Sequence, residues 1–198
     1  MFCPTLQNTI QATLERSKKH TYWDGSVFEE LVKLGNDERG SWGEETFASY
    51  VAALTTKQLC WDGDKNNNTL DGVYDMFYKC SKSRQKIRVE EKTAFRGKQG
   101  VWQHEGICDS EMWDRLVLFD VDYATIYVTI LKYSEINFHE KHPVFQRKMH
   151  LRKNEKNKYK WDFSLKQLML GCENGLTFAL DVNAPDYKKF AKFIETRL

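Results

Sequence analysis

The amino-acid sequence predicts an α/β (α+β) protein, with a mixed central sheet flanked by helices. Apolar residues recur at helical spacing near both ends of the chain, while the middle alternates or runs apolar over strand lengths. The length of 198 residues suits one domain with a sizeable hydrophobic core. A composition of 41% hydrophobic and 29% charged residues excludes a disordered or fibrous chain. We therefore expect residues 1–198 to form a single domain.

Three helices are expected before the first strand. Apolar residues at every fourth position predict one over 6–14, and a second covers 26–34 and ends at a glycine. The glycines of segment 40–43 are expected to break the chain. The third helix then covers 44–54, with Ser41 as its N-cap and a glutamate at the capping-box spacing.

The central part of the chain reads mainly as strands. Residues 73–79 and 86–93 predict a hairpin around a short polar loop. Segment 97–106, bounded by glycines, is expected to begin a helix that runs toward residue 113. The β-branched, apolar runs 115–121 and 123–131 predict two further strands, which can pair as a second hairpin.

The last third of the chain is expected to be less regular. Segment 140–160 is irregular and basic. A short helix over 165–170 is expected to end at Gly171, and a short strand follows at 176–180. The final helix covers 185–196 and starts with a proline, which the first turn of a helix tolerates.

Charge and cysteine usage narrow the function classes. The 30 basic and 28 acidic residues leave a net charge of +2, which excludes nucleic-acid binding by bulk charge but permits a local basic face. No apolar run approaches the roughly 18 residues of a membrane-spanning helix, and we expect no membrane partner. No signal-peptide pattern opens the sequence, and its five cysteines are scattered without a CxxC pair. These features predict a cytoplasmic protein with reduced thiols.

Carboxylates and a lysine gather in the first predicted hairpin. Glu90 and Lys92 are two residues apart in one strand and therefore share a face. Asp75, in the preceding strand, meets them if the register is right, and Asp71 is its rival in the turn before that strand. Carboxylate oxygens suit Mg²⁺, and a neighbouring ammonium can orient a water or stabilise negative charge. The alternative is an exposed ion pair without a catalytic role.

The order of these motifs resembles the PD-(D/E)xK nuclease superfamily, which includes type II restriction endonucleases. The resemblance implies a restriction-endonuclease-like core of αβββαβ order. It also implies that Asp75, Glu90 and Lys92 are catalytic, with Asp75, Glu90 and the backbone carbonyl of Glu91 as metal ligands. Glu44 matches the auxiliary acidic residue on the preceding helix. The cofactor implied is Mg²⁺, for which Mn²⁺ can substitute.

The resemblance covers about residues 40–130. It leaves N-terminal helices within 1–39 and a basic C-terminal elaboration at 131–198. Two positions depart from the family pattern, since Tyr74 stands where many members have proline and Glu91 where most have an apolar residue. A charged Glu91 needs a partner or an exposed face, and the choice between Glu90 and Glu91 as ligand stays open.

Basic and amide residues around this motif are candidates for DNA contact. Segment 147–160 carries seven basic residues, which suit phosphate neutralisation if they flank a phosphodiesterase site and a solvated loop otherwise. His104 is open to a second interpretation, an ordinary hydrogen-bonded histidine. The candidate DNA-binding residues are Lys82, Arg84, Arg96, Lys98, Gln103, His104, Arg147, Lys148, Arg152, Lys153, Lys156, Lys158 and Lys160.

The sequence thus predicts a Mg²⁺-dependent DNA endonuclease. The first hypothesis is a type II restriction endonuclease that binds double-stranded DNA and acts as a homodimer on a palindromic site. The second is a structure-specific or repair nuclease, of the resolvase or nicking type, with the same core. The third is a nuclease-like module that has lost catalysis and only binds DNA.

Overall fold

A six-stranded sheet forms the centre of the molecule. The computed structural model describes residues 22–61, 74–79, 85–110 and 112–198. The strand order in the central sheet is β1-β2-β3-β5-β6-β9. The strands are β1 (Cys60–Trp61), β2 (Met76–Lys79), β3 (Lys86–Phe95), β5 (Arg115–Val121), β6 (Thr125–Lys132) and β9 (Thr177–Asp181).

The central sheet is mixed. β1, β2 and β3 are antiparallel, β3 and β5 are parallel, and β5, β6 and β9 are antiparallel. The two predicted hairpins, β2–β3 and β5–β6, are therefore both present. A mixed sheet with helices on its faces confirms the α+β class.

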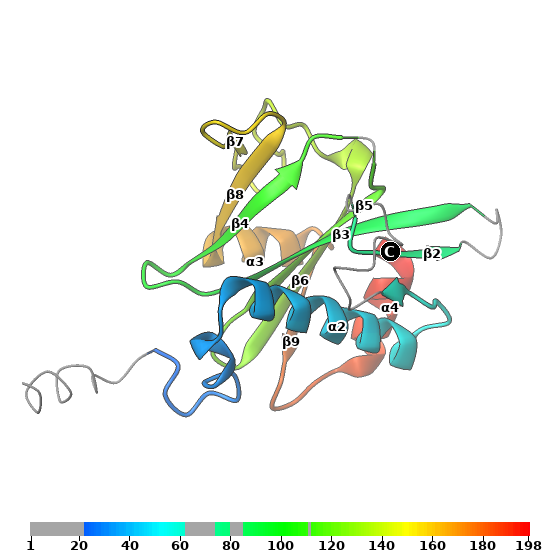
Figure 1. The fold of residues 1–198 in the computed structure, drawn as a ribbon. Coiled ribbons are helices and arrows are strands. Elements are labelled where there is room, and N and C mark those ends of the chain that lie inside the picture. The colour runs from blue at the N-terminus through cyan, green and yellow to red at the C-terminus, as the bar shows by residue number, and fades with distance from the viewer. Residues whose placement is uncertain (1–21, 62–73, 80–84, 111) are drawn as a thin grey trace, which may run out of the picture.

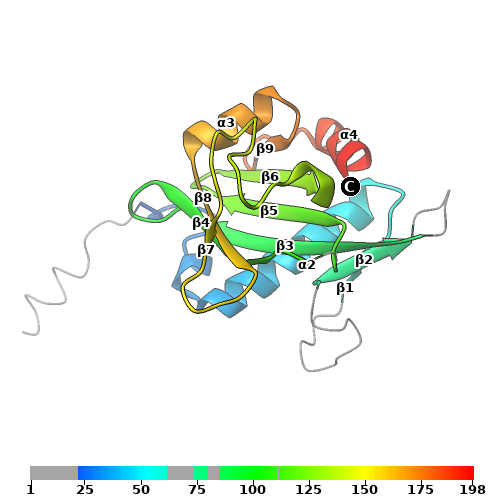
Figure 2. The ribbon, with the colours of Figure 1, turned by 90° about the horizontal axis from the view of Figure 1, so that it is seen from above.

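Different layers cover the two faces of this sheet (Figures 1 and 2). Helices α2 (Asn36–Leu54) and α4 (Tyr187–Arg197) lie on one face. The other face carries α3 (Leu165–Glu173) and a second, three-stranded sheet of order β4-β8-β7. The second sheet consists of β4 (Val101–Cys108), β8 (Lys158–Ser164) and β7 (His150–Leu151). Two 3-10 turns complete the structure, η1 (Leu31–Lys33) and η2 (Tyr133–Glu135).

Two hydrophobic clusters hold these layers together, and β5 belongs to both. Val117 and Phe119 pack toward α2 and α4, whereas Leu116 and Leu118 pack toward α3 and the second sheet. Alternate residues of a strand point to opposite faces, so a strand buried on both faces reads as a continuous apolar run. This explains why the sequence of β5 shows no polar alternation.

The first described helix differs from its prediction. α2 begins at Asn36 and passes through segment 40–43 without a break, so Ser41 lies inside the helix and is not its N-cap. Gly35 precedes the helix, and its amide donates a hydrogen bond to the Glu38 carboxylate at 2.7 Å. The predicted helix over 26–34 is reduced to turns and η1. The predicted helix over 6–14 lies outside the described residues.

Gly43 shows why α2 continues through its glycines. A Cβ atom on Gly43 would lie 1.6 Å from the Thr93 hydroxyl oxygen on β3, so only glycine permits this close approach. Glycine costs roughly 1 kcal/mol in a helix interior, but packing against the sheet decides whether the helix forms. The glycine that was expected to break the helix therefore brings it onto β3.

The connection from β3 to β5 also differs from its prediction. The segment expected to begin a helix is strand β4, which pairs with β8. Trp102 and His104 are buried, while Gln103 and Glu105 are exposed. This alternation has the period of a strand with one buried face, and the flanking glycines obscured it.

The C-terminal third is part of the core. β9 is an edge strand of the central sheet, and α4 packs against α2 and β6, so the sheet continues past the expected core boundary at residue 130. α3 continues through Gly171 to Glu173 and does not end at that glycine. A Cβ on Gly171 would lie 2.1 Å from the Thr177 hydroxyl oxygen, which again indicates close helix-to-strand packing. Among the described residues, no helix is both long and apolar enough to span a bilayer.

Candidate active site

The hairpin of β2 and β3 brings the predicted acidic residues together. Asp75 directly precedes β2, and its amide donates a hydrogen bond to the Val89 carbonyl at 3.0 Å. Its carboxylate accepts a hydrogen bond from the amide of Glu91 at 2.7 Å. These two bonds fix Asp75 beside the middle of β3. The rival residue, Asp71, lies outside the described residues.

Lys92 binds three oxygen atoms. Its Nζ lies 2.5 Å from Glu90 Oε1 and 3.8 Å from Asp75 Oδ2. The ammonium also donates a hydrogen bond to the backbone carbonyl of Glu91 at 2.9 Å. Burial disfavours the charged lysine, but Glu90 and Asp75 more than offset this and raise the pKa of Lys92. The group formed by Asp75, Glu90, Lys92 and the Glu91 carbonyl is called the Lys92 site below.

The carboxyl group of Glu90 has a raised pKa in this site. Burial raises the pKa of its carboxyl to about 7, and the negative charges of Asp75 and Glu44 act in the same direction. The ammonium of Lys92 opposes the shift. Glu90 therefore changes its charge near neutral pH, where an additional cation would favour the ionised form.

Glu91 points to the other face of β3. Its carboxyl is 2% exposed and accepts a hydrogen bond from the Thr93 hydroxyl at 2.8 Å, so this buried glutamate has the partner it needs. Burial raises its pKa well above the usual value, and Asp75 and Glu44 raise it further. Only Glu90 places its carboxylate against Lys92, so the geometry favours Glu90 as a ligand and Glu91 as a contributor of its carbonyl.

Glu44 approaches the site from α2. It is 6% exposed, and its charge raises the pKa of both Glu90 and Glu91. Gly43 allows α2 to approach β3 at this point of the helix. Glu44 thus lies close enough to act on the site electrostatically, and its role as an auxiliary ligand stays a prediction.

The oxygen atoms of the Lys92 site suit a hard divalent cation. Two carboxylates and one carbonyl converge on a single cationic group, and oxygen ligands of this kind are those Mg²⁺ prefers. Within the described ranges, no three His, Cys, Asp or Glu side chains are arranged to hold a metal. The third oxygen here comes from the backbone, and the ammonium lies among the three oxygens. A metal held by these three oxygens would therefore compete with the ammonium of Lys92.

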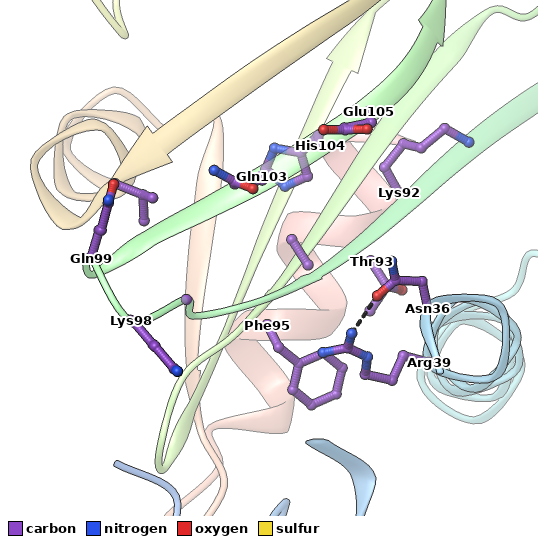
Figure 3. A pocket seen from close by; sticks show the side chains of 13 residues that line it. Asn36, Arg39, Lys92, Thr93, Phe95, Lys98, Gln99, Gln103, His104 and Glu105 are labelled. Carbon is purple, nitrogen blue, oxygen red and sulfur yellow. Dashed lines mark hydrogen bonds between the residues drawn. The ribbon is translucent and has the colours of Figure 1, made fainter. Parts of the chain in front are cut away.

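A cleft of about 520 Å³ adjoins the Lys92 site (Figure 3). β3 forms its floor, the first turn of α2 one wall, and β4 with the preceding turn the other. Its polar lining consists of Asn36, Arg39, Lys92, Thr93, Lys98, Gln99, Gln103, His104 and Glu105, and this group is called the cleft below.

His104 lines the cleft but is not a surface residue. Its side chain is buried, with Nε2 2.6 Å from Asp120 Oδ1 and Nδ1 2.9 Å from the Trp161 carbonyl oxygen. His104 is thus a buried, hydrogen-bonded histidine, as the second interpretation expected, and its contact with DNA stays a prediction. It lies on the buried face of β4, whereas the neighbouring Gln103 is exposed.

Arg96 is also engaged within the protein. Its guanidinium lies 3.3 Å from the Asp122 carboxylate and donates a hydrogen bond to the Tyr22 hydroxyl at 2.7 Å. It stacks over the rings of Tyr22 and Trp102. These contacts hold Arg96 in place at the end of β3, and its contact with DNA stays a prediction.

The basic segment forms a hairpin beside the cleft. Arg152 and Lys160 each lie near the carboxylate of Glu105, at 3.3 and 3.5 Å, so the β7–β8 hairpin borders the cleft wall. Lys158 pairs with Glu155 at 3.3 Å. Four other predicted residues are exposed: Arg147, Lys148, Lys153 and Lys156. Lys82 and Arg84 lie outside the described residues.

Two residues of the cleft were not predicted from the sequence. Asn36 and Arg39 lie three apart on the first turns of α2, on the side of the helix that lines the cleft. Their i, i+3 spacing indicates a shared helical face. Because a break was expected at 40–43, Asn36 and Arg39 were placed outside the helix, and their i, i+3 spacing was not recognised.

Comparison with known proteins found no matching family model, no matching curated protein and no matching solved structure. The nuclease interpretation therefore depends on the residues and geometry of this chain.

Proposed function

We propose that this protein is a Mg²⁺-dependent endodeoxyribonuclease. The observation that carries the proposal is the convergence of Asp75, Glu90 and the Glu91 carbonyl on the ammonium of Lys92. An exposed ion pair, the alternative from the sequence, would not explain a buried Glu90 or a second carboxylate from a preceding element.

The arrangement supports hydrolysis of a phosphodiester. Asp75, Glu90 and the Glu91 carbonyl would hold the cation, and Glu44 would act as an auxiliary carboxylate. Bound Mg²⁺ supplies Lewis-acid polarisation of a phosphate oxygen and lowers the pKa of a water ligand. When Glu90 is ionised, both carboxylate ligands, Asp75 and Glu90, carry a negative charge. A bound cation would favour this ionised form of Glu90.

Lys92 supplies the positive charge that acts on the substrate. Once displaced from the carboxylates, its ammonium can donate hydrogen bonds to the attacking water or to a phosphate oxygen. Negative charge grows on those oxygens in the transition state, and a preorganised donor stabilises it there. In the metal-free protein Glu90 and Asp75 raise the pKa of Lys92, so the group enters the reaction as a charged hydrogen-bond donor.

The fold is consistent with a restriction-endonuclease-like core. α2, the β2–β3 hairpin and parallel strand β5 follow in the order that the nuclease resemblance implies. Strand β4 of the second sheet stands where that core has a helix. We propose that this protein replaces the crossover helix by a sheet that borders the substrate cleft.

The test is cleavage of plasmid and phage DNA with Mg²⁺ or Mn²⁺ by the wild type and two variants. Asp75→Asn and Lys92→Ala should each lower the rate by at least about 100-fold, because Asp75 would hold the cation and Lys92 would stabilise the developing negative charge. Lys188→Ala, on the exposed side of α4, should retain wild-type activity. Intact activity in both site variants would contradict the proposal.

Calorimetry with Ca²⁺ separates the two variants. Asp75→Asn removes a ligand and should weaken Ca²⁺ binding. Lys92→Ala removes the cation that competes for the same oxygens, so Ca²⁺ should bind at least as tightly as to the wild type. Absence of carboxylate-dependent binding in the wild type would favour the third hypothesis, a module without catalysis.

The same digests distinguish the two nuclease roles. Discrete fragments from plain double-stranded DNA would indicate a restriction endonuclease. That role also predicts a homodimer, which sedimentation would detect, because two symmetric sites cut both strands of a palindrome. Preference for branched or nicked DNA would indicate the structure-specific role.

A further inference from the structure

Among the described residues, no strand pairs with the cleft-facing edge of β3 beyond Val89, where its pairing with β2 ends, and this edge is called the open edge below. The Val89 carbonyl and the Glu91 amide both point to this edge, because they bond to Asp75. Successive residues of a strand present their backbone groups to alternate edges, so those of Thr93 and Phe95 point the same way.

The open edge extends the Lys92 site along the strand. From Glu91 to Phe95 is four residues, or about 13 Å of strand. The backbone amides of Thr93 and Phe95 offer hydrogen-bond donors along this path. A chain that places a phosphate at Lys92 would therefore continue over the floor of the cleft.

The cleft walls carry groups that suit a nucleotide. Gln99 and Gln103 are exposed side chains on the β4 side. Asn36 is exposed on the α2 side, where its amide oxygen accepts a hydrogen bond from Arg39 and its NH₂ group remains as a donor (Figure 3). Such amides can pair with the edge of a base. The guanidinium of Arg39 lies over the ring of Phe95, 5.4 Å from its centre, and offers a flat surface for stacking. Lys98 adds a positive charge where the turn meets the cleft.

We propose that the cleft binds one unpaired nucleotide of the DNA substrate, next to the scissile phosphate. The inference rests on the proposed nuclease function and specifies its substrate. A volume of about 520 Å³ is that of a small-ligand pocket, which accommodates a single base and sugar. A paired base cannot enter between α2 and β4 without leaving its partner. The substrate is accordingly unpaired at this position.

The cleavage test uses four duplexes with one unpaired A, C, G or T, a fully paired duplex and a single strand. The wild type should cut the unpaired substrates at least about tenfold faster than the paired duplex. Gln103→Ala should alter the ranking of the four bases by about five- to 100-fold, the effect of removing one base-edge interaction. Gln58→Ala, an exposed amide away from the cleft, should leave the ranking unchanged. Equal cutting of the paired duplex, or uniform loss over all four bases, would overturn the proposal.

A binding test separates this inference from the nuclease function. Fluorescence anisotropy of a labelled hexanucleotide is measured in EDTA, where no cleavage occurs. Lys98→Ala and Gln103→Ala should each weaken binding severalfold, while Asp75→Asn and Gln58→Ala should not. Binding that is insensitive to the cleft variants would overturn the inference even if the protein cuts DNA. Cleft-dependent binding without any cleavage would instead reject the nuclease function and retain the nucleotide site.

Discussion

At the level of single residues, burial and the ammonium of Lys92 have opposite effects on Glu90. Burial favours the protonated carboxyl group, and Lys92 favours the ionised one. Glu90 contacts the ammonium directly, and Asp75 is held in place by the Glu91 amide. Removing the lysine would leave Glu90 buried without its counter-charge. The free energy of this balance depends on pH because the pKa of Glu90 is raised to about 7.

In metal-free protein, the free energy of unfolding should fall as the pH rises from about 4.5 to 7. In this window the folded state retains a proton on Glu90 that the unfolded state has released, so a higher pH favours unfolding. The shift corresponds to a contribution of about 3 kcal/mol across the window, at roughly 1.4 kcal/mol per pKa unit. Urea unfolding at a series of pH values measures it.

Two variants isolate the contribution of Glu90. Glu90→Gln cannot titrate and should remove the part of this slope that Glu90 contributes, leaving the part from Glu91, whose pKa burial also raises. Glu140→Gln, at an exposed position, should keep the wild-type slope. An unchanged slope in Glu90→Gln would show that another group causes it. Saturating Mg²⁺ should stabilise the wild type above pH 7, where Glu90 is ionised, and not the Gln variant.

The two glycines of α2 should respond in opposite directions to alanine. Gly43→Ala places a methyl group against Thr93 and should destabilise the protein by about 1–3 kcal/mol. Gly40 has nothing within 4 Å of its would-be Cβ, so Gly40→Ala should stabilise by about 0.5–1 kcal/mol through helix propensity. Urea unfolding compares them, and equal effects would contradict the close packing of α2 on β3.

At the level of elements, the His104–Asp120 pair joins the two sheets. His104 comes from β4 of the second sheet and Asp120 from β5 of the central sheet, and both are fully buried. The Trp161 carbonyl can only accept, so Nδ1 of His104 donates to it and Nε2 shares a proton with Asp120. Although burial opposes a charged ring, Asp120 raises the pKa of His104. This pair fixes the cleft wall against the strand next to β3.

Breaking the His104–Asp120 pair should destabilise the folded protein. Asp120→Asn removes the charge opposite His104 and should lower the free energy of unfolding by about 3 kcal/mol, as removal of one partner of a buried pair does. The double variant His104→Phe/Asp120→Leu replaces both polar groups and should recover most of that loss. Urea unfolding of the single and double variants measures this coupling, and no recovery in the double variant would argue against it.

At the level of the whole molecule, the charge is distributed unevenly despite the net value of +2. Carboxylates lie at the Lys92 site, while exposed basic residues project from the β7–β8 hairpin that borders the cleft. Arg152 and Lys160 are partly neutralised by Glu105. Lys148, Lys153 and Lys156 remain the better candidates for phosphate contacts.

DNA affinity should therefore depend on salt and on this hairpin. Removing one lysine that neutralises a phosphate lowers the slope of log K against log[salt] by about 0.9. The triple variant of Lys148, Lys153 and Lys156 to Gln should reduce the slope by about two to three and weaken binding at low salt. Lys188→Gln, on α4 at the opposite face of the central sheet, is the control. An unchanged slope in the triple variant would exclude the hairpin as a DNA-binding surface.

Strand periodicity predicted the two hairpins of the central sheet and placed Asp75 opposite the strand of Glu90 and Lys92. Glycines, read as local breaks in secondary structure, gave wrong predictions in two places. Glycines at 40–43 suggested a break where α2 is continuous, and glycines around β4 suggested a helix where a strand lies. In both cases the deciding contact comes from a distant residue, Thr93 for Gly43 and Asp120 for His104.

The sequence alone determined which groups can form the site, because residues two apart on a strand share a face and a short loop between adjacent strands forces them to pair. It also led to the proposed chemistry, since carboxylates beside a lysine suit a divalent cation and a phosphate. Only the tertiary structure decided that Glu91 is buried beside the Thr93 hydroxyl, that His104 is buried, and that α2 and β4 enclose a cleft beside β3. These features depend on how separate layers pack across the sheet, which local periodicity does not encode.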